Sequence, residues 1–289
     1  MAEALVLAAG PWREARRRLR AHRSFTPALG VLVLLTLLAL IGPWLSPWNF
    51  DALDWQHLAA PPGAAGAHWF GTDRLGRDLW VRSLTGLRLS LAVSVLASLV
   101  SLLVGLAYGS IAGYAGGRTD ELMMRAVDVL YALPYLFIVI ILTGLLPHGG
   151  LTVLFIALGA VGWLTTARIV RAQTHSLRRR EFIEAARALG VAPTGILARH
   201  VVPNLLGPVI VYATLTVPQM ILYESFLSFL GLGVQEPHAS LGNLIAVGAQ
   251  EMSSAPWMLL VPACLLVVLL LALNLLGEAL RDALDPHEP

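Results

Sequence analysis

Long apolar runs alternate with short polar segments along most of the chain. A helix needs about 20 predominantly apolar residues to cross the hydrocarbon core of a bilayer. Six runs reach or approach this length: Pro27 to Leu45, Leu89 to Ala112, Val127 to Leu146, Leu151 to Ala167, Leu205 to Leu230 and Trp257 to Leu276. The pattern therefore predicts an all-α polytopic membrane protein with six transmembrane helices.

The first run could instead be a cleaved signal peptide, because arginines precede it. The only A-x-A-like stretch nearby, Ala65 to Ala67, lies far beyond the apolar run, whereas a signal peptidase site lies next to it. We therefore expect the first helix to be retained. In the second run, Gly105 and Gly109 are four residues apart, a spacing that allows another helix to approach closely.

Composition agrees with a membrane protein and excludes one kind of ATPase. Hydrophobic residues make up 57% of the 289 residues and charged residues only 13%, against about 25% charged in soluble domains. All 20 basic residues are arginine, so the lysine of a GxxxxGK[ST] phosphate-binding loop is missing. We expect no catalytic residues and no cofactor in this chain. The net charge of +2 gives no reason to expect nucleic acid as a partner.

The arginines also predict the orientation, because cytoplasmic loops retain positive charge. Sixteen of the 20 fall in the N-terminal tail, after the second and fourth runs, and after the sixth, which places these segments and both termini in the cytoplasm. The predicted organisation is a cytoplasmic tail (1–26), a first transmembrane helix (27–45), a periplasmic segment (46–88), a core of five transmembrane helices (89–277) and a cytoplasmic tail (278–289). The core contains a long cytoplasmic loop at about 168–204.

This loop contains a charged, helix-forming stretch, EFIEAARALG, at residues 181–190. As a helix it places four apolar side chains on one stripe: Phe182, Ile183, Ala186 and Leu189. Gly190 suits a left-handed stop, Pro193 suits the start of a second short helix, and Pro203 is expected to break the chain before the fifth run. The physical pattern leaves two interpretations open: a loop lying in the lipid headgroups, or a docking surface for another protein.

A resemblance favours docking. Glu184-Ala185-Ala186, followed by Gly190 and then Pro203, resembles the signature loop of binding-protein-dependent ABC importer permeases, although His200 and Val202 depart from its usual isoleucine and leucine. Further stretches resemble the oligopeptide, dipeptide and nickel branch of that family, closest to the second (C-type) permease subunit of oligopeptide importers. They are His68 to Gly86, Gly113 to Leu130, Ala167 to Ala186, Glu224 to Pro237 and Leu275 to Pro286.

The resemblance implies a type I importer permease fold in the bacterial inner membrane, with a coupling helix that docks on separate ATPase subunits. The coupling residues it implies are Glu181, Glu184, Ala185, Ala186, Gly190 and Pro203. It also implies a second homologous permease, two ATPase subunits that bind ATP and Mg²⁺, and a periplasmic or lipid-anchored substrate-binding protein. The favoured cargo is an oligopeptide, with dipeptides, glutathione or nickel as alternatives.

Two further groups of polar residues are candidates for function. Asp73, Arg77 and Asp78 lie in the predicted periplasmic segment, where we expect contact with the binding protein or a cap on the second helix. A metal site there, with His68, is the less favoured interpretation, and we predict none.

Gln219 and Glu224 lie inside the fifth run, where polar groups are costly and usually face the bundle interior. A structural role for Glu224, accepting backbone hydrogen bonds, competes with a role in the translocation path or its gate. An intramembrane carboxylate would also suit a proton-coupled secondary transporter, but no inverted repeat supports that alternative.

Overall fold

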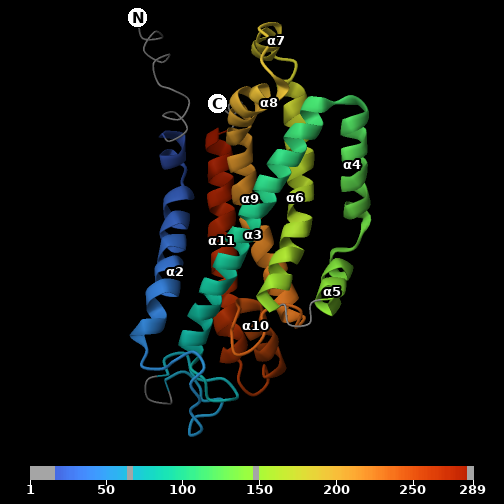
Figure 1. The fold of residues 1–289 in the computed structure, drawn as a ribbon. Helices are drawn as coiled ribbons and strands as arrows, with labels where there is room; N and C mark the ends of the chain where they lie inside the picture. Colours follow the sequence, from blue (N-terminus) through green and yellow to red (C-terminus); the bar gives the residue numbers. More distant parts are fainter. Residues whose placement is uncertain (1–16, 64–67, 146–149, 285–289) are drawn as a thin grey trace, which may run out of the picture. The chain divides into compact units, whose positions relative to one another are not determined.

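The computed structural model describes residues 17–63, 68–145 and 150–284, which form α-helices joined by short turns and one long loop (Figure 1). Residues 1–16 of the predicted N-terminal tail, the turn at 146–149 and residues 285–289 lie outside the described part. No β-strand forms in the described residues, where an isolated bridge joins Thr72 and Asp78. The helices are α2 (Phe25–Leu45), α3 (Leu79–Ala115), α4 (Gly117–Ala132), α5 (Tyr135–Leu145), α6 (Gly150–Leu177), α7 (Glu181–Ala188), α8 (Pro193–Ile196), a π turn η2 (Leu197–Val201), α9 (Val202–Phe229), α10 (Leu241–Gln250) and α11 (Trp257–Leu284).

The predicted all-helical membrane architecture is confirmed, but one predicted span is not a straight helix. Five helices in the described residues are long and apolar enough to cross a membrane. The third predicted run, 127–146, is divided between α4 and α5, which meet at an angle of 81° and count as a sixth span only together. Pro134 explains the break: the residue before a proline is pushed out of the helical region, and Leu133 has φ −77° and ψ 128°.

Several helices extend beyond their predicted ends. α3 begins ten residues before Leu89, α6 continues ten residues past Ala167, and α11 continues eight residues past Leu276. Apolar runs mark only the part of a helix suited to lipid, whereas a helix can continue into water when its polar side chains find partners. The first ten residues of the predicted loop at 168–204 are therefore the last ten residues of α6.

The chain forms two compact units. The first comprises residues 1–88 and 247–289. In it α2 packs against α11, and His22 Nε2 lies 3.3 Å from Asp282 Oδ2. The long loop at 46–78 is tied to α11, because Trp257 Nε1 donates to the Thr72 carbonyl at 3.3 Å. The first turn of α3 is tied to α2, because Trp80 Nε1 donates to the Gly42 carbonyl at 2.9 Å.

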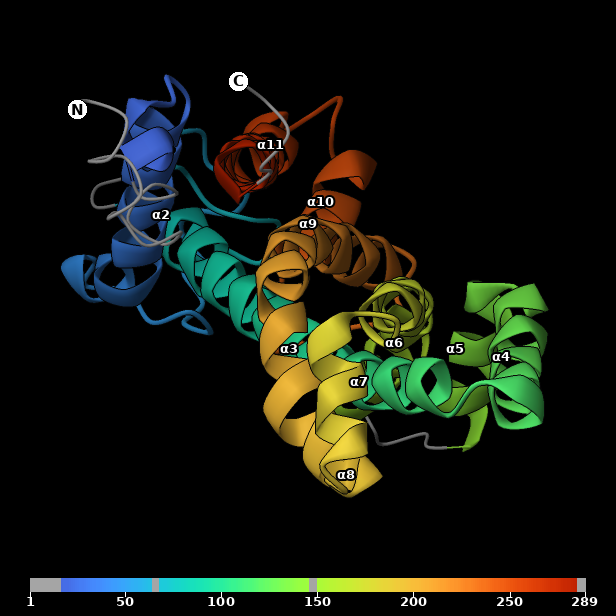
Figure 2. The same cartoon turned by 90° about the horizontal axis from the view of Figure 1, so that it is seen from above.

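The second unit comprises residues 89–246 and is organised around α6. Figure 2 shows α6 between α9 on one side and the α4–α5 pair on the other, and all three pack against it. The predicted close approach at Gly105 and Gly109 is confirmed. A Cβ on Gly109 would lie 2.4 Å from the Ala167 carbonyl oxygen of α6, and one on Gly105 would lie 2.5 Å from Thr166 Cβ.

Candidate functional site

Helix α7 forms where the sequence predicts a short charged helix. It begins at Glu181, after Arg180 in an extended conformation, and both Glu181 and Glu184 lie in its first turn, where negative charge suits the helix dipole. Gly190 ends it with φ +77°. The Gly190 N–H donates to the Arg187 carbonyl at 2.9 Å, and the Val191 N–H donates to the Ala186 carbonyl at 3.1 Å. This pair of bonds is a Schellman motif, so the predicted left-handed stop is confirmed.

One face of α7 is anchored in the second unit. Ile183 and Ala186 are buried in a cluster whose other buried members are Val170, Ile196, Val201 and Leu205. The predicted four-residue stripe is therefore only half right, because Phe182 and Leu189 are 44% and 84% exposed. Successive residues of a helix point about 100° apart around its axis. The buried face is centred between Ile183 and Ala186, so it is rotated from the centre of the predicted stripe towards Arg187. The two outer apolar side chains are left at the edge of the contact.

Arg187 and Arg178 fasten α7 and the turn before it to the end of α3. The Arg187 guanidinium lies 5.2 Å from the centre of the Tyr114 ring, a cation–π contact, and its Nε donates to the Tyr114 hydroxyl at 3.4 Å. Arg178 Nη1 donates to the Tyr114 carbonyl at 3.0 Å. The sequence analysis missed Tyr114, because it is about 70 residues from Arg187 and no local pattern links them.

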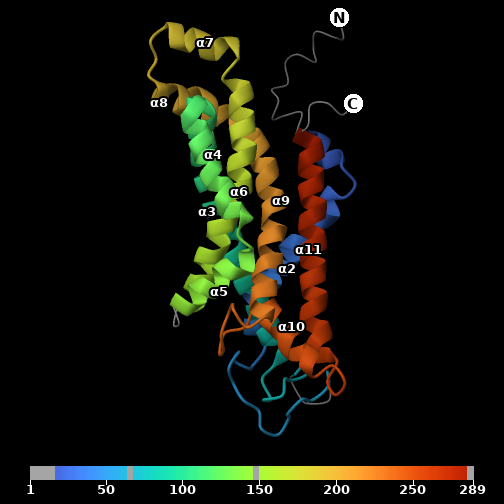
Figure 3. The ribbon, with the colours of Figure 1, turned by 90° about the vertical axis from the view of Figure 1, so that its right-hand side faces the viewer.

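The opposite face of α7 is exposed and points away from the helices that support it (Figure 3). It combines two carboxylates, Glu181 and Glu184, with the small Ala185, and the exposed apolar Phe182 and Leu189 lie at its edge. Such a surface can dock in a groove that offers apolar contact and positive charge. It has no arrangement of nucleophile and base that would support covalent chemistry.

Pro203 does not break the chain, contrary to the prediction. A continuous helical path of 37 residues runs from Pro193 to Phe229, with Pro203 in the first turn of α9. The five-residue π turn at Leu197–Val201 precedes it, and the Val202 N–H donates to the Leu197 carbonyl. The wider π turn leaves room for the proline ring and needs no N–H from it. Asn204 Nδ2 donates to the His200 carbonyl at 2.7 Å, so this carbonyl of the π turn also has a hydrogen-bond donor.

Ion pairs connect α6 to α4. Arg171 forms a two-pronged contact with Asp120, at 2.5 and 2.6 Å, and His175 Nε2 lies 3.0 Å from the same carboxylate. Arg168 Nη2 donates to Asp128 at 2.8 Å. Arg168 and Arg171, two of the arginines that predict a cytoplasmic loop, therefore also hold α6 and α4 together.

Asp73, Arg77 and Asp78 have an internal role, contrary to the expected contact with a binding protein. All three are buried, with at most 5% of each residue exposed. Arg77 Nε donates to Asp73 Oδ2 at 2.6 Å. Asp78 Oδ1 accepts from the Val81 N–H at 2.8 Å, which caps the start of α3 as the alternative expectation held. Polar residues in a loop indicate a need for partners but do not show whether these lie inside the chain.

Glu224 and Gln219 are not brought together. Glu224 is fully buried and accepts from the hydroxyls of Ser90 at 2.7 Å and Ser228 at 2.8 Å. These partners are side-chain hydroxyls, whereas we expected backbone N–H groups. Ser90 is 134 residues away and could not be identified from the sequence. Gln219 is exposed, and its Nε2 donates to the Tyr223 hydroxyl at 3.2 Å.

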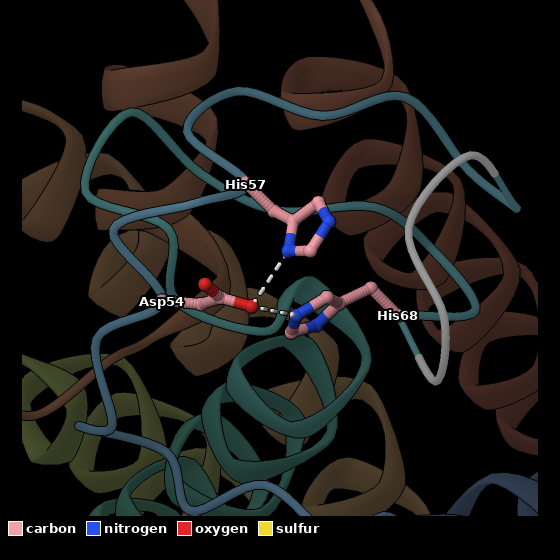
Figure 4. Close-up of side chains that lie close together, drawn as sticks. All are labelled: Asp54, His57 and His68. Carbon is pink, nitrogen blue, oxygen red and sulfur yellow. Dashed lines mark hydrogen bonds and ion pairs between the residues drawn. The ribbon is translucent and has the colours of Figure 1, made fainter.

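The loop at 46–78 brings together a third group, which the sequence analysis did not predict. The side chains of Asp54, His57 and His68 converge (Figure 4), with potential ligand atoms within 4.8 Å of one another. The His57 imidazole, hydrogen bonded to Asp54, holds the pKa of that carboxyl below its usual value, and the Gln56 N–H acts in the same direction. Asp54 and His57 are three residues apart, a local signal that the search for candidate residues overlooked.

Comparison with known proteins places these features in context. Residues 105–288 match the family described as "Binding-protein-dependent transport system inner membrane component", and residues 10–62 match "N-terminal TM domain of oligopeptide transport permease C". The family match includes α7 and the helices that anchor it.

Curated relatives cover nearly the whole chain. It is 50% identical to "Oligopeptide transport system permease protein OppC" of Escherichia coli (strain K12), over 96% of this chain and 91% of that protein. The protein of the same name from Haemophilus influenzae is 45% identical, over 96% and 89%. "Dipeptide transport system permease protein DppC" of Bacillus subtilis is 43% identical, over 94% and 85%.

Among solved structures, the chain is similar to a chain of the MetNI methionine ABC transporter in an inward-facing conformation. The TM-score is 0.56 at 19% identity, covering 71% of this chain and 96% of that one. This likeness supports the helical fold alone.

Proposed function

The chain belongs to the family of binding-protein-dependent transport system inner membrane components, and from this premise we propose that it carries oligopeptides across the membrane. It is a multi-pass permease subunit of an ABC importer, a transport component and not an enzyme. Such a permease works with ATPase and substrate-binding partners. This family membership excludes the proton-coupled secondary transporter considered from the sequence.

The cargo proposal rests on the names of the relatives. Two of them, at 50% and 45% identity, are oligopeptide permeases, and the segment at residues 10–62 matches a domain named for the same permease. A dipeptide permease at 43% identity makes dipeptide import the second candidate. The three curated relatives described above are named for oligopeptides or dipeptides, and none of the three for glutathione or nickel.

We propose the following assembly. A second homologous permease completes the translocation path, two ATPase subunits bind ATP and Mg²⁺ on the cytoplasmic side, and a periplasmic or lipid-anchored protein delivers the peptide. Both termini of this chain lie in the cytoplasm. The distribution of arginines supports this orientation.

We propose that α7 is the coupling helix. Its Glu181, Glu184 and Ala185 face outwards to an ATPase groove, while Ala186 anchors it and Gly190 sets the turn to α8. Pro203 begins the helix that continues into the membrane. Because α7 is packed on α6 and α9 and fastened to the end of α3, a displacement of α7 would move these helices together. ATP-driven closure of the ATPases would then rock the bundle between its two orientations.

The two polar residues of α9 receive different proposals. Glu224 is buried among serines, which supports a structural role within the second unit. Gln219 is exposed in this chain and remains the candidate for the translocation path. An exposed amide can offer hydrogen bonds to the backbone of a passing peptide.

Reconstitution tests the function. We expect proteoliposomes that contain this chain, its sister permease and the ATPases to accumulate a labelled tetrapeptide only when the binding protein is outside and ATP is enclosed inside, where it reaches the ATPases that face the lumen. Excess unlabelled tetrapeptide should compete strongly, and dipeptide, glutathione or Ni²⁺ weakly. The isolated chain should hydrolyse no ATP.

The competition separates the candidates. Strong competition by a dipeptide, with weak competition by the tetrapeptide, would assign the chain to dipeptide import. ATP-independent accumulation driven by a proton gradient would contradict the importer mechanism.

A further inference from the structure

The loop at 46–78 contains a site that none of the transport features explains. Asp54 Oδ2 lies 2.8 Å from His57 Nδ1 and 3.4 Å from His68 Nε2, so two imidazole nitrogens approach one carboxylate oxygen (Figure 4). His68 is buried, with 1% exposed, and Asp54 is largely buried, whereas the His57 side chain is 41% exposed.

The surroundings of His68 determine which of its nitrogens is available. Its Nδ1 lies 2.8 Å from Oδ2 of the fully buried Asp78. An ionised carboxylate only accepts hydrogen bonds, so Nδ1 carries the proton and donates it. Nε2 is the nitrogen on the side of Asp54, 3.4 Å from its Oδ2, and is therefore the atom of this ring that can bind a metal beside Asp54 and His57.

From this geometry we propose that Asp54, His57 and His68 bind Zn²⁺, with water in the fourth position. Two imidazole nitrogens and one carboxylate oxygen are typical zinc ligands, at about 2.0–2.2 Å from the metal. In a tetrahedron of that size, neighbouring ligand atoms are about 3.3 Å apart. Of the two distances to Asp54 Oδ2, the 3.4 Å to His68 is close to this value and the 2.8 Å to His57 is shorter. All potential ligand atoms lie within 4.8 Å of one another, so the widest pair would have to close by at most about 1.5 Å, a movement open to the half-exposed His57.

Asp78 provides the supporting hydrogen bond that zinc-binding histidines usually have. A carboxylate on the far nitrogen fixes the tautomer and orientation of the ring and raises the basicity of the ligand. Trp48 stacks on the His68 ring at 4.4 Å between ring centres and adds a second constraint. His68 is therefore held in a binding orientation before any metal arrives.

The backbone holds Asp54 equally firmly. The Asp54 N–H donates to the Gly76 carbonyl at 3.3 Å, and Gly76 has φ +78°. A Cβ on Gly76 would lie 2.0 Å from the Asp54 carbonyl oxygen. The turn at Gly76 thus sets the position of Asp54. A bound metal would link Asp54 and His57, in the first part of the loop at 46–78, to His68 in its later part.

Metal titration of the intact chain tests this proposal. The chain is purified in nanodiscs without a polyhistidine tag, freed of metal, and titrated with ZnCl₂ against a chromophoric chelator. We expect one tight site per chain. Asp78→Asn should weaken binding by about 10- to 100-fold, the usual effect of removing such a supporting group. His57→Gln and Asp54→Asn remove ligands and should weaken it at least as much.

His238→Gln is the matched control, since it removes an exposed histidine from the other unit and should leave the affinity unchanged. Co²⁺ bound in place of Zn²⁺ should give the intense visible bands of a four-coordinate ion. Equal zinc binding by the wild type, His57→Gln and Asp54→Asn would overturn the proposal, as would the weak bands of six-coordinate Co²⁺. His57 and Asp54 carry the test because neither is fully buried, so their variants are expected to fold.

Discussion

Neighbouring residues of α7 have opposite environments, so one side chain can anchor the helix while the next is available to a partner. Ile183 is fully buried, and Glu184 beside it is exposed. A change at Ile183 would alter the support of the helix, whereas a change at Glu184 alters only what α7 presents to a partner. Glu184 is therefore the residue that best tests the coupling proposal.

We expect Glu184→Arg to insert normally and to lose transport. A like-charge contact in a basic ATPase groove costs several kcal/mol. A carboxylate facing only lipid headgroups contributes about 1 kcal/mol or less, and its reversal would matter little. The measurements are the membrane level of the permease, ATPase co-purification and peptide uptake.

Glu121→Arg is the matched control, because it reverses an exposed carboxylate on α4 outside the coupling surface. Wild-type uptake and co-purification by Glu184→Arg would favour the lipid-lying interpretation of α7. A compensating charge reversal in the ATPase groove that restores uptake would identify the contact directly.

At the scale of elements, the contact between α3 and α6 depends on the absence of side chains. Gly105 and Gly109 bring the two helices so close that added methyl groups would meet Thr166 and the Ala167 carbonyl. Backbone atoms cannot move aside as a flexible side chain can. Since α6 also anchors α7 and pairs with α4, this contact sets the position of the central helix in its unit.

Gly109→Ala should therefore destabilise the protein, although glycine to alanine normally favours a helix by roughly 0.5–1 kcal/mol. Overpacking against backbone costs about 1–3 kcal/mol, which outweighs the gain in propensity. Gly207→Ala in α9, where a Cβ meets nothing within 4 Å, is the control and should be neutral or stabilising. The comparison is of thermal unfolding in nanodiscs followed by circular dichroism. Equal melting temperatures for Gly109→Ala and the wild type would contradict the close packing.

At the scale of the whole molecule, the orientation rests on arginine counts and carries the coupling proposal with it. Only the cytoplasmic side offers ATP, so α7 must lie there to act on an ATPase. The segment around Met252 should then lie in the periplasm. Arg179 and Met252 are both exposed, in turns outside the helices, and can report the two sides.

Cysteine labelling checks this orientation in a Cys264→Ala background, which removes the single, exposed cysteine of the chain. We expect Met252→Cys to react with a membrane-impermeant maleimide in intact spheroplasts, and Arg179→Cys to react only after lysis. Normal uptake by both variants is the control for correct insertion. The reverse labelling pattern would overturn the positive-inside assignment and place α7 on the wrong side for coupling.

The features that could be predicted from the sequence are those that a local signal determines. Gly190 and Pro193 mark the turn and the start of α8 because left-handed geometry and a fixed φ are properties of single residues. Pro134 carried an equally local signal for the break between α4 and α5, which the long apolar run obscured. Tyr114 and the serine partner of Glu224 carried none, since their contacts join residues far apart in sequence.

The buried carboxylates show a second limit. Asp73 and Asp78 were expected to contact a binding protein or to cap the second helix. Their partners are instead an arginine, backbone N–H groups and His68 within the chain. A sequence lists the charges of a segment but does not say which of them satisfy one another.

The π turn at Leu197–Val201 has a consequence for insertions and deletions. This turn holds one residue more than an α turn, between the support of α7 and the start of α9. Deleting one residue there would let the backbone return to the α pattern. The preceding helices α7 and α8 would then be rotated by about 100° relative to α9. Substitutions at Leu197 or Ala198 preserve the residue count, whereas a deletion would turn the docking face of α7 towards another direction. The length of this five-residue turn is thus under stronger constraint than its composition.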